Sequence, residues 1–132
     1  MSRVLALDYG SARCGVAISD PTGTLATPLQ AVERPDGRRG FGYLTRLVAE
    51  RGADRVVVGL PLTLAGEEGA QAEVTRAFAA RLAAAIAVPV DLHDERLTTR
   101  QAERTGGDAD ADSRAAAHLL EAYLRAPARP GG

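Results

Sequence analysis

The stretch DRVVVGLPL, residues 54–62, is an almost continuous run of apolar, largely β-branched residues. A strand with one face in water would alternate apolar and polar residues, so this run predicts a strand that is buried on both faces. Helices cover both sides of a sheet that contains such strands. The run therefore favours an α/β fold.

The segments before this run predict further strands. RVLALD (3–8) and CGVAISD (14–20) are short apolar runs joined by a turn that contains glycine, and they indicate a hairpin. TLATPLQAVER (24–34) predicts a third strand, which Pro28 confines to an edge or a bulge. We therefore expect an antiparallel meander at the start of the sheet.

The rest of the chain alternates helices and strands. Phe41, Leu44, Leu47 and Val48 recur at helical spacing, and Gly52 is the expected helix stop. The further expected elements are a helix over about 67–86, a strand over 87–93, a short helix over 97–104 and a last helix over 112–125. The order β-β-β-α-β-α-β-α-α predicts one domain, residues 1–125, with a mixed five-stranded sheet and helices on both faces. Residues 126–132 are expected to form a flexible tail.

Length and composition limit the possible classes of protein. The 132 residues suit one domain, and no apolar run approaches the about 18 residues that a membrane span needs. The N-terminus has no secretory pattern, and a single cysteine cannot form an internal disulfide, so we expect a cytoplasmic protein without a membrane partner. A net charge of −1 argues against a highly basic nucleic-acid binder without excluding one, and every basic side chain except histidine is arginine.

Three acidic residues stand where a ligand would bind. Asp8 ends the first predicted strand, Glu95 follows the fifth, and Asp112 opens the last helix. Ligands of such folds bind outside the carboxyl ends of the parallel strands, so we expect these carboxylates to converge there. Oxygen ligands favour Mg²⁺ or Mn²⁺ over zinc, and a paired-metal site suits attack of water on a phosphodiester. Structural roles stay open on spacing alone, because Asp8 can form a turn and Asp112 can cap a helix.

Four segments together resemble the YqgF family: LALDYGSARCGVAISD, VVVGLPLTLAGEEG, DERLTTRQAE and DSRAAAHLLEAYL. The family is described as pre-16S rRNA nucleases and as Holliday-junction-resolvase-like proteins, with an RNase H-like fold. The resemblance runs from about residue 3 to residue 125. It implies that Asp8, Glu95 and Asp112 are the catalytic and metal-binding acids, with two Mg²⁺ or Mn²⁺ ions in the presence of substrate. The products would carry a 5′-phosphate and a 3′-hydroxyl.

Other residues are candidates for contacts with nucleic acid: Arg13, Arg96, Thr98, Thr99, Arg100 and Arg104. Arg13 could hold a phosphate or form a surface salt bridge. The threonines could cap a helix or bind phosphate, and the last three arginines form a stripe that is either a phosphate track or a solvated helix face. Gly15 would let nucleic acid or a neighbouring strand approach closely.

The sequence departs from the family pattern in three places. Thr63 stands where the family usually has Asn, and Ala12 replaces a turn residue that is often basic. The loop TGGDADADSR carries Asp108 and Asp110, where the family is typically basic. These acids could weaken the binding of nucleic acid, add metal ligands, or replace Asp112 as the third ligand.

The resemblance implies a metal-dependent endonuclease that acts in processing of the 16S rRNA precursor 5′ end, during ribosome biogenesis. The expected partner is RNA, free or on the small ribosomal subunit, or else branched DNA. A junction-resolving DNA nuclease is one alternative, and it would act as a symmetric dimer. A non-catalytic RNA- or ribosome-binding factor with weak or lost nuclease activity is another. The expected assembly is a monomer or a weak homodimer.

Overall fold

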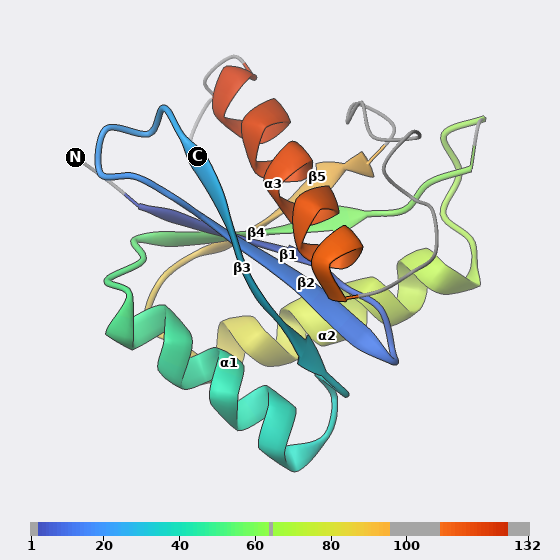
Figure 1. The fold of residues 1–132 in the computed structure, drawn as a ribbon. Coiled ribbons are helices and arrows are strands. Elements are labelled where there is room, and N and C mark those ends of the chain that lie inside the picture. Colours follow the sequence, from blue (N-terminus) through green and yellow to red (C-terminus); the bar gives the residue numbers. More distant parts are fainter. Residues whose placement is uncertain (1–2, 64, 96–108, 127–132) are drawn as a thin grey trace.

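The structure is a computed structural model that describes residues 3–63, 65–95 and 109–126, without the side chains of 109 and 110 (Figure 1). The elements in these ranges are β1 (Val4–Asp8), β2 (Arg13–Ser19), β3 (Ala26–Glu33), α1 (Arg38–Glu50), β4 (Arg55–Leu60), α2 (Ala70–Ala85), β5 (Val90–Asp94) and α3 (Ala109–Arg125). The short helix expected over 97–104 and residues 127–132 of the expected tail lie outside the described residues.

The strands form one mixed sheet in the order β3-β2-β1-β4-β5. β1, β2 and β3 pair as an antiparallel meander, whereas β1 with β4 and β4 with β5 are parallel pairs. Parallel neighbours need a crossover connection, which α1 and α2 provide. The predicted α/β class with five strands is confirmed, and Pro28 lies on the edge strand β3, as expected.

The helices cover both faces of this sheet. Leu5 and Leu7 of β1 pack in a core cluster with residues of α1 and α2, including Leu44 and Phe78. Ala6, between them, packs instead in a second cluster with residues of α3. Figure 1 shows α1 and α2 on one side of the sheet and α3 on the other. We call the side that α3 covers the α3 face.

β4 has the burial that its sequence predicts. Val56, Val57 and Val58 are all 0% exposed. Val56 and Val58 belong to the cluster beneath α1 and α2, and Val57 belongs to the cluster beneath α3. The apolar run therefore marks a strand that is enclosed from both sides.

Three helix starts differ from the prediction. α3 begins at Ala109, so Asp112 lies inside this helix and does not open it. α1 begins at Arg38, before the apolar periodicity starts at Phe41, because Arg38 and Arg39 at its start are polar and exposed. α2 begins at Ala70 rather than near 67. The residues before it form a small turn, in which the Thr63 N–H donates to the Glu67 carbonyl at 2.9 Å and the Glu67 N–H donates to Thr63 Oγ1 at 3.0 Å. The predicted stop of α1 is confirmed, since Gly52 has a φ of 64°.

The parallel register brings three strand ends to one edge of the sheet. Leu7 of β1 pairs with Val58 of β4, and Leu60 of β4 pairs with Asp94 of β5. The carboxyl ends of β1, β4 and β5 therefore lie together, and we call this place the catalytic edge because the predicted catalytic residues Asp8 and Glu95 lie at these strand ends. In the described ranges, no helix combines the length and the apolar character that crossing a membrane requires.

Candidate functional site

Asp8 is the last residue of β1, the central strand of the sheet. Val4 and Ala6 pack in the cluster beneath α3, and strand alternation puts the Asp8 side chain on the same α3 face. Asp8 is only 8% exposed. The first predicted ligand is therefore a largely enclosed carboxylate at the middle of the catalytic edge.

Glu95 directly follows β5, and its side chain reaches over the neighbouring strand β4. A Cβ at Gly59 would lie 2.8 Å from Cγ and 3.1 Å from Cδ of Glu95. Val58 pairs with Leu7, so the next residue of β4, Gly59, is level with Asp8. Neighbouring strands are about 4.8 Å apart. Glycine at 59 therefore makes room for Glu95 beside Asp8.

Asp112 lies in the N-terminal part of α3, where the helix contacts β2. Gly15 of β2 pairs with Asp8, and a Cβ at Gly15 would overlap the carbonyl oxygen of Asp112. The close approach expected at Gly15 is therefore made by a helix, and not by nucleic acid or a neighbouring strand. Asp112 and Glu95 consequently lie over the two strands that flank Asp8.

An ion pair connects Asp112 to β2. Arg13 Nε donates to Asp112 Oδ2 at 2.8 Å, and the two side chains are 36% and 21% exposed. A salt bridge was one of the two predicted roles of Arg13, and it is present. Its partner is Asp112, the third predicted metal ligand. Because the pair is partly exposed, solvent screening keeps its contribution to stability modest.

Ser113 is a positioning residue that the sequence analysis did not identify. The register between β2 and β3 shifts between Cys14 and Val16. The Val16 N–H donates to Ser113 Oγ at 3.3 Å, and Ser113 is 1% exposed. A buried backbone N–H needs a hydrogen-bond partner, so this hydroxyl ties the start of α3 to the irregular part of β2.

The thiol of Cys14 lies next to this group of acids. Complete burial raises its pKa well above the usual value, and the negative charges of Asp8, Asp112 and Asp36 raise it further. Cys14 belongs to the core cluster beneath α1 and α2, where it packs as a small core residue.

The three acids share an edge and a face of the sheet without forming a closed set of ligands. Within the described residues, no group of three or more His, Cys, Asp or Glu side chains is arranged to hold a metal ion. The carboxylate of Asp112 instead pairs with Arg13. Carboxylate oxygens from separate elements match the chemistry of Mg²⁺ and Mn²⁺. Asp112 would join such a site by breaking its ion pair with Arg13 and binding the metal ion instead.

Several predicted site residues lie outside the described part of the chain: Arg96, Thr98, Thr99, Arg100, Arg104 and Asp108. For Asp110 the helical backbone is described and the side chain is not. The proposed contacts of these residues with nucleic acid or metal stay predictions.

Comparison with known proteins assigns the chain to a family. The model of the RuvX family, described as "Holliday junction resolvase", matches residues 2–126. The chain belongs to the RuvX family. The match includes Asp8, Glu95 and Asp112 together with the glycines that bring them close, so the whole catalytic edge lies inside the family domain.

Curated relatives of this RuvX-family chain are similar along most of their length. A protein of Chloroflexus aurantiacus is 45% identical over 132 residues, which is 93% of this chain and 86% of that protein. A protein of Listeria monocytogenes is 41% identical over 133 residues, covering 92% of this chain and 96% of that protein. Both are named "Putative pre-16S rRNA nuclease". The predicted family is therefore confirmed.

The fold of the RuvX-family chain also matches a solved structure. RuvC of T. thermophilus in complex with a Holliday junction substrate aligns with a TM-score of 0.60 over 95% of this chain and 96% of that chain. The sequence identity is 16%, so the likeness concerns the fold alone. It confirms the RNase H-like fold that the sequence resemblance implies.

Proposed function

We propose that the chain is a metal-dependent endonuclease that hydrolyses phosphodiester bonds of structured RNA, with the 5′ end of the 16S rRNA precursor as its substrate. The observation that carries the proposal is the packing around Asp8. Gly59 on one side admits Glu95, and Gly15 on the other side admits the backbone of Asp112. The names of the curated relatives support rRNA as the substrate. The reaction would take place in the cytoplasm, on the free precursor or on the small ribosomal subunit.

Asp8, Glu95 and Asp112 would hold Mg²⁺ or Mn²⁺, two ions once substrate is bound. Such ions supply Lewis-acid assistance to the attack of water on a phosphodiester. The rest of the protein holds these three metal ligands in position. The central strand holds Asp8, the missing side chain at Gly59 gives Glu95 its place, and Ser113 and Gly15 fix the start of α3.

Arg13 also has a role in the proposed reaction, because its guanidinium can move from Asp112 to a phosphate. Its guanidinium pairs with Asp112. A metal ion that recruits Asp112 would release Arg13 next to the site where a phosphate arrives, and a guanidinium binds phosphate through two parallel hydrogen bonds. Arg96, Thr98, Thr99, Arg100 and Arg104 are proposed to hold the phosphates that follow.

Specific observations favour two other functions. The family description, Holliday junction resolvase, favours cleavage of four-way DNA junctions by a homodimer, because two opposed strands must be cut. The lack of a closed metal site among the described residues favours a non-catalytic RNA- or ribosome-binding factor. Structured RNA is preferred because the curated relatives are named for rRNA.

A cleavage panel tests the proposal. The protein is incubated with a pre-16S rRNA 5′ fragment, a single-stranded RNA and a four-way DNA junction, each with Mg²⁺, with Mn²⁺ or with EDTA. We expect metal-dependent cleavage of the pre-16S fragment that leaves a 5′-phosphate, and no such cleavage by Asp8→Asn. Cleavage of the junction alone would replace RNA by DNA as the substrate. Binding of the fragment without cleavage under every metal condition would establish the non-catalytic alternative.

A further inference from the structure

A basic surface lies on the outer side of β3 and α1, away from the α3 face. Four arginines form it: Arg34, Arg38, Arg39 and Arg46. All four are exposed, and within the described residues none of them forms an ion pair. We call this group the α1 arginine surface. Unpaired guanidinium groups gathered in one place attract polyanions, and phosphate is the anion that their planar geometry fits.

The start of α1 adds to this positive charge. Arg38 and Arg39 occupy the first turn, which contains no acidic residue. Gly37 is the N-cap and provides no side-chain hydrogen bond to the helix. Cations at a helix N-terminus oppose the helix dipole and are locally unfavourable, whereas an anion there is stabilised by the free N–H groups. A bound phosphate would remove this electrostatic conflict.

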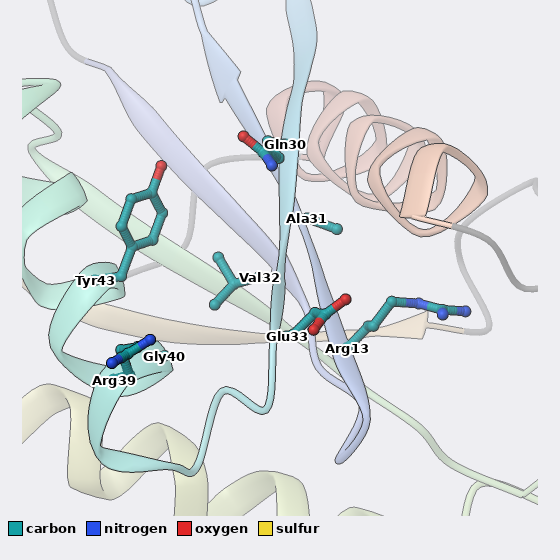
Figure 2. Close-up of a pocket in the computed structure, with 8 residues that line it drawn as sticks. All are labelled: Arg13, Gln30, Ala31, Val32, Glu33, Arg39, Gly40 and Tyr43. Carbon is teal, nitrogen blue, oxygen red and sulfur yellow. The ribbon is translucent and has the colours of Figure 1, made fainter.

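A pocket of about 400 Å³ lies next to these arginines, along the outer edge of β3 (Figure 2). Tyr43 is 41% exposed and contributes its ring to the lining. Gln30 and Glu33 also line the pocket. An exposed aromatic ring can stack on a base, and amide and carboxylate groups can recognise the hydrogen-bonding edge of that base. The carboxylate of Glu33 would repel a phosphate, so the pocket itself suits a base and the surrounding arginines suit the backbone.

Arg13 joins this pocket to the catalytic edge. It lines the pocket beside Glu33, its neighbour in the sheet register, and it pairs with Asp112 on the α3 face. In Figure 2 its guanidinium points away from the Tyr43 side of β3. Arg13 therefore lies between Asp112 and the pocket that borders the α1 arginine surface.

We propose that the α1 arginine surface and the β3 pocket hold a single-stranded RNA segment that adjoins the bond to be cut. One base stacks on Tyr43, and the phosphates on either side contact Arg38, Arg39 and Arg46. A single strand is required because a base inside a duplex does not expose its face to an aromatic side chain. The inference rests on the proposed function only in taking RNA as the substrate, and it adds a binding surface outside the catalytic acids.

Binding without metal tests this inference separately from cleavage. Fluorescence anisotropy is measured with a labelled single-stranded RNA of about 15 nucleotides, enough to fill one such site. EDTA is present, and the salt concentration is varied. The Arg39→Ala/Arg46→Ala variant should bind roughly ten-fold more weakly at low salt, and the slope of log K against log salt should shrink by about 1.4, which is about 0.7 for each lost phosphate contact.

The matched control removes a positive charge elsewhere. Arg125→Ala changes an exposed residue at the C-terminal end of α3, on the face of the sheet opposite α1. Because distant exposed charges are screened, its affinity should stay within about two-fold of the parent. Tyr43→Ala should weaken binding about five-fold or more, while Tyr43→Phe keeps the stacking surface and should bind like the parent. Circular dichroism and Tm verify that all variants are folded.

The possible results separate the two proposals. If the parent cuts RNA and Arg39→Ala/Arg46→Ala keeps parental affinity and salt slope, the inference is overturned and the proposed function stands. If the variant loses affinity only for a duplex RNA probe, the single-strand assignment is wrong. If the parent binds RNA through these arginines but cuts none of the substrates under any metal condition, the inference holds and the proposed nuclease activity fails.

Discussion

Gly15 and Gly59 flank Asp8 on the two neighbouring strands, and alanine should have different effects at the two positions. At Gly59 the new methyl group would lie 2.8 Å from Cγ of Glu95, so one side chain has to move. Overpacking lowers the free energy of unfolding by about 1–3 kcal/mol. Alanine also restricts the unfolded chain more than glycine does, which raises the free energy of unfolding by about 0.4–1 kcal/mol. Because Glu95 can rotate, we expect the free energy of unfolding of Gly59→Ala to stay within about 1 kcal/mol of the parent.

At Gly15 the methyl group would overlap the backbone of Asp112, so the start of α3 must leave the sheet. The hydrogen bonds from Arg13 to Asp112 and from Val16 to Ser113 would be lost or weakened with it. Overpacking and two weakened hydrogen bonds together should lower the free energy of unfolding by about 2–3 kcal/mol. For a chain of this size this corresponds to a fall in Tm of roughly 10 °C.

Urea unfolding followed by circular dichroism, together with RNA cleavage at saturating Mg²⁺, distinguishes the two variants. Gly59→Ala should be nearly as stable as the parent yet cleave about 100-fold more slowly, because misplacement of a catalytic group by about 1 Å has an effect of that size. Parental cleavage by Gly59→Ala would refute the role given to the position of Glu95. Parental stability of Gly15→Ala would refute the close packing of α3 on β2.

Three further predictions concern single side chains. Arg13→Gln should lower the Mg²⁺ concentration for half-maximal cleavage, because no guanidinium then competes for Asp112; an unchanged or higher midpoint in a metal titration would contradict this. Hydrogen bonds from the Thr22 hydroxyl and two backbone N–H groups lower the pKa of Asp20 from 3.8 to about 2, so its stabilising contribution is complete above pH 3.8 and is lost as the pH falls towards 2. Thermal melts of Asp20→Asn should consequently depend less on pH in that window than those of the parent. Burial raises the pKa of the Cys14 thiol, so iodoacetamide should label it in urea but not in native buffer, and rapid native labelling would count against its buried position.

The sequence predicts most of the fold because the apolar pattern of each strand reports its burial. The run Val56–Val58 correctly predicts a strand enclosed on both faces, and Gly52 correctly predicts the end of α1. The start of α2 is harder to predict, because Glu67 and Glu68 precede the helix and would also suit its first turn. Helix starts in polar segments carry no apolar periodicity, so patterns locate them poorly.

The sequence predicts which strand ends form the site, but it does not predict the side-chain contacts within it. The catalytic edge is predictable because carboxyl ends of parallel strands lie together, which puts Asp8 and Glu95 near each other. The pairing of Arg13 with Asp112 joins residues 99 positions apart, and no local pattern contains it. The contact of Ser113 with the irregular part of β2 is equally hidden, since it depends on how α3 docks against the sheet.

The central claim is that Asp8, Glu95 and Asp112 together carry metal-dependent cleavage. The most direct test compares the cleavage of the pre-16S 5′ fragment by the parent with that by Asp8→Asn, Glu95→Gln and Asp112→Asn. All four proteins are assayed at equal concentration with Mg²⁺, after circular dichroism has verified their folding. We predict metal-dependent cleavage by the parent and loss of cleavage in each of the three folded variants. Parental cleavage rates in Asp8→Asn and Glu95→Gln would contradict the assignment of the site.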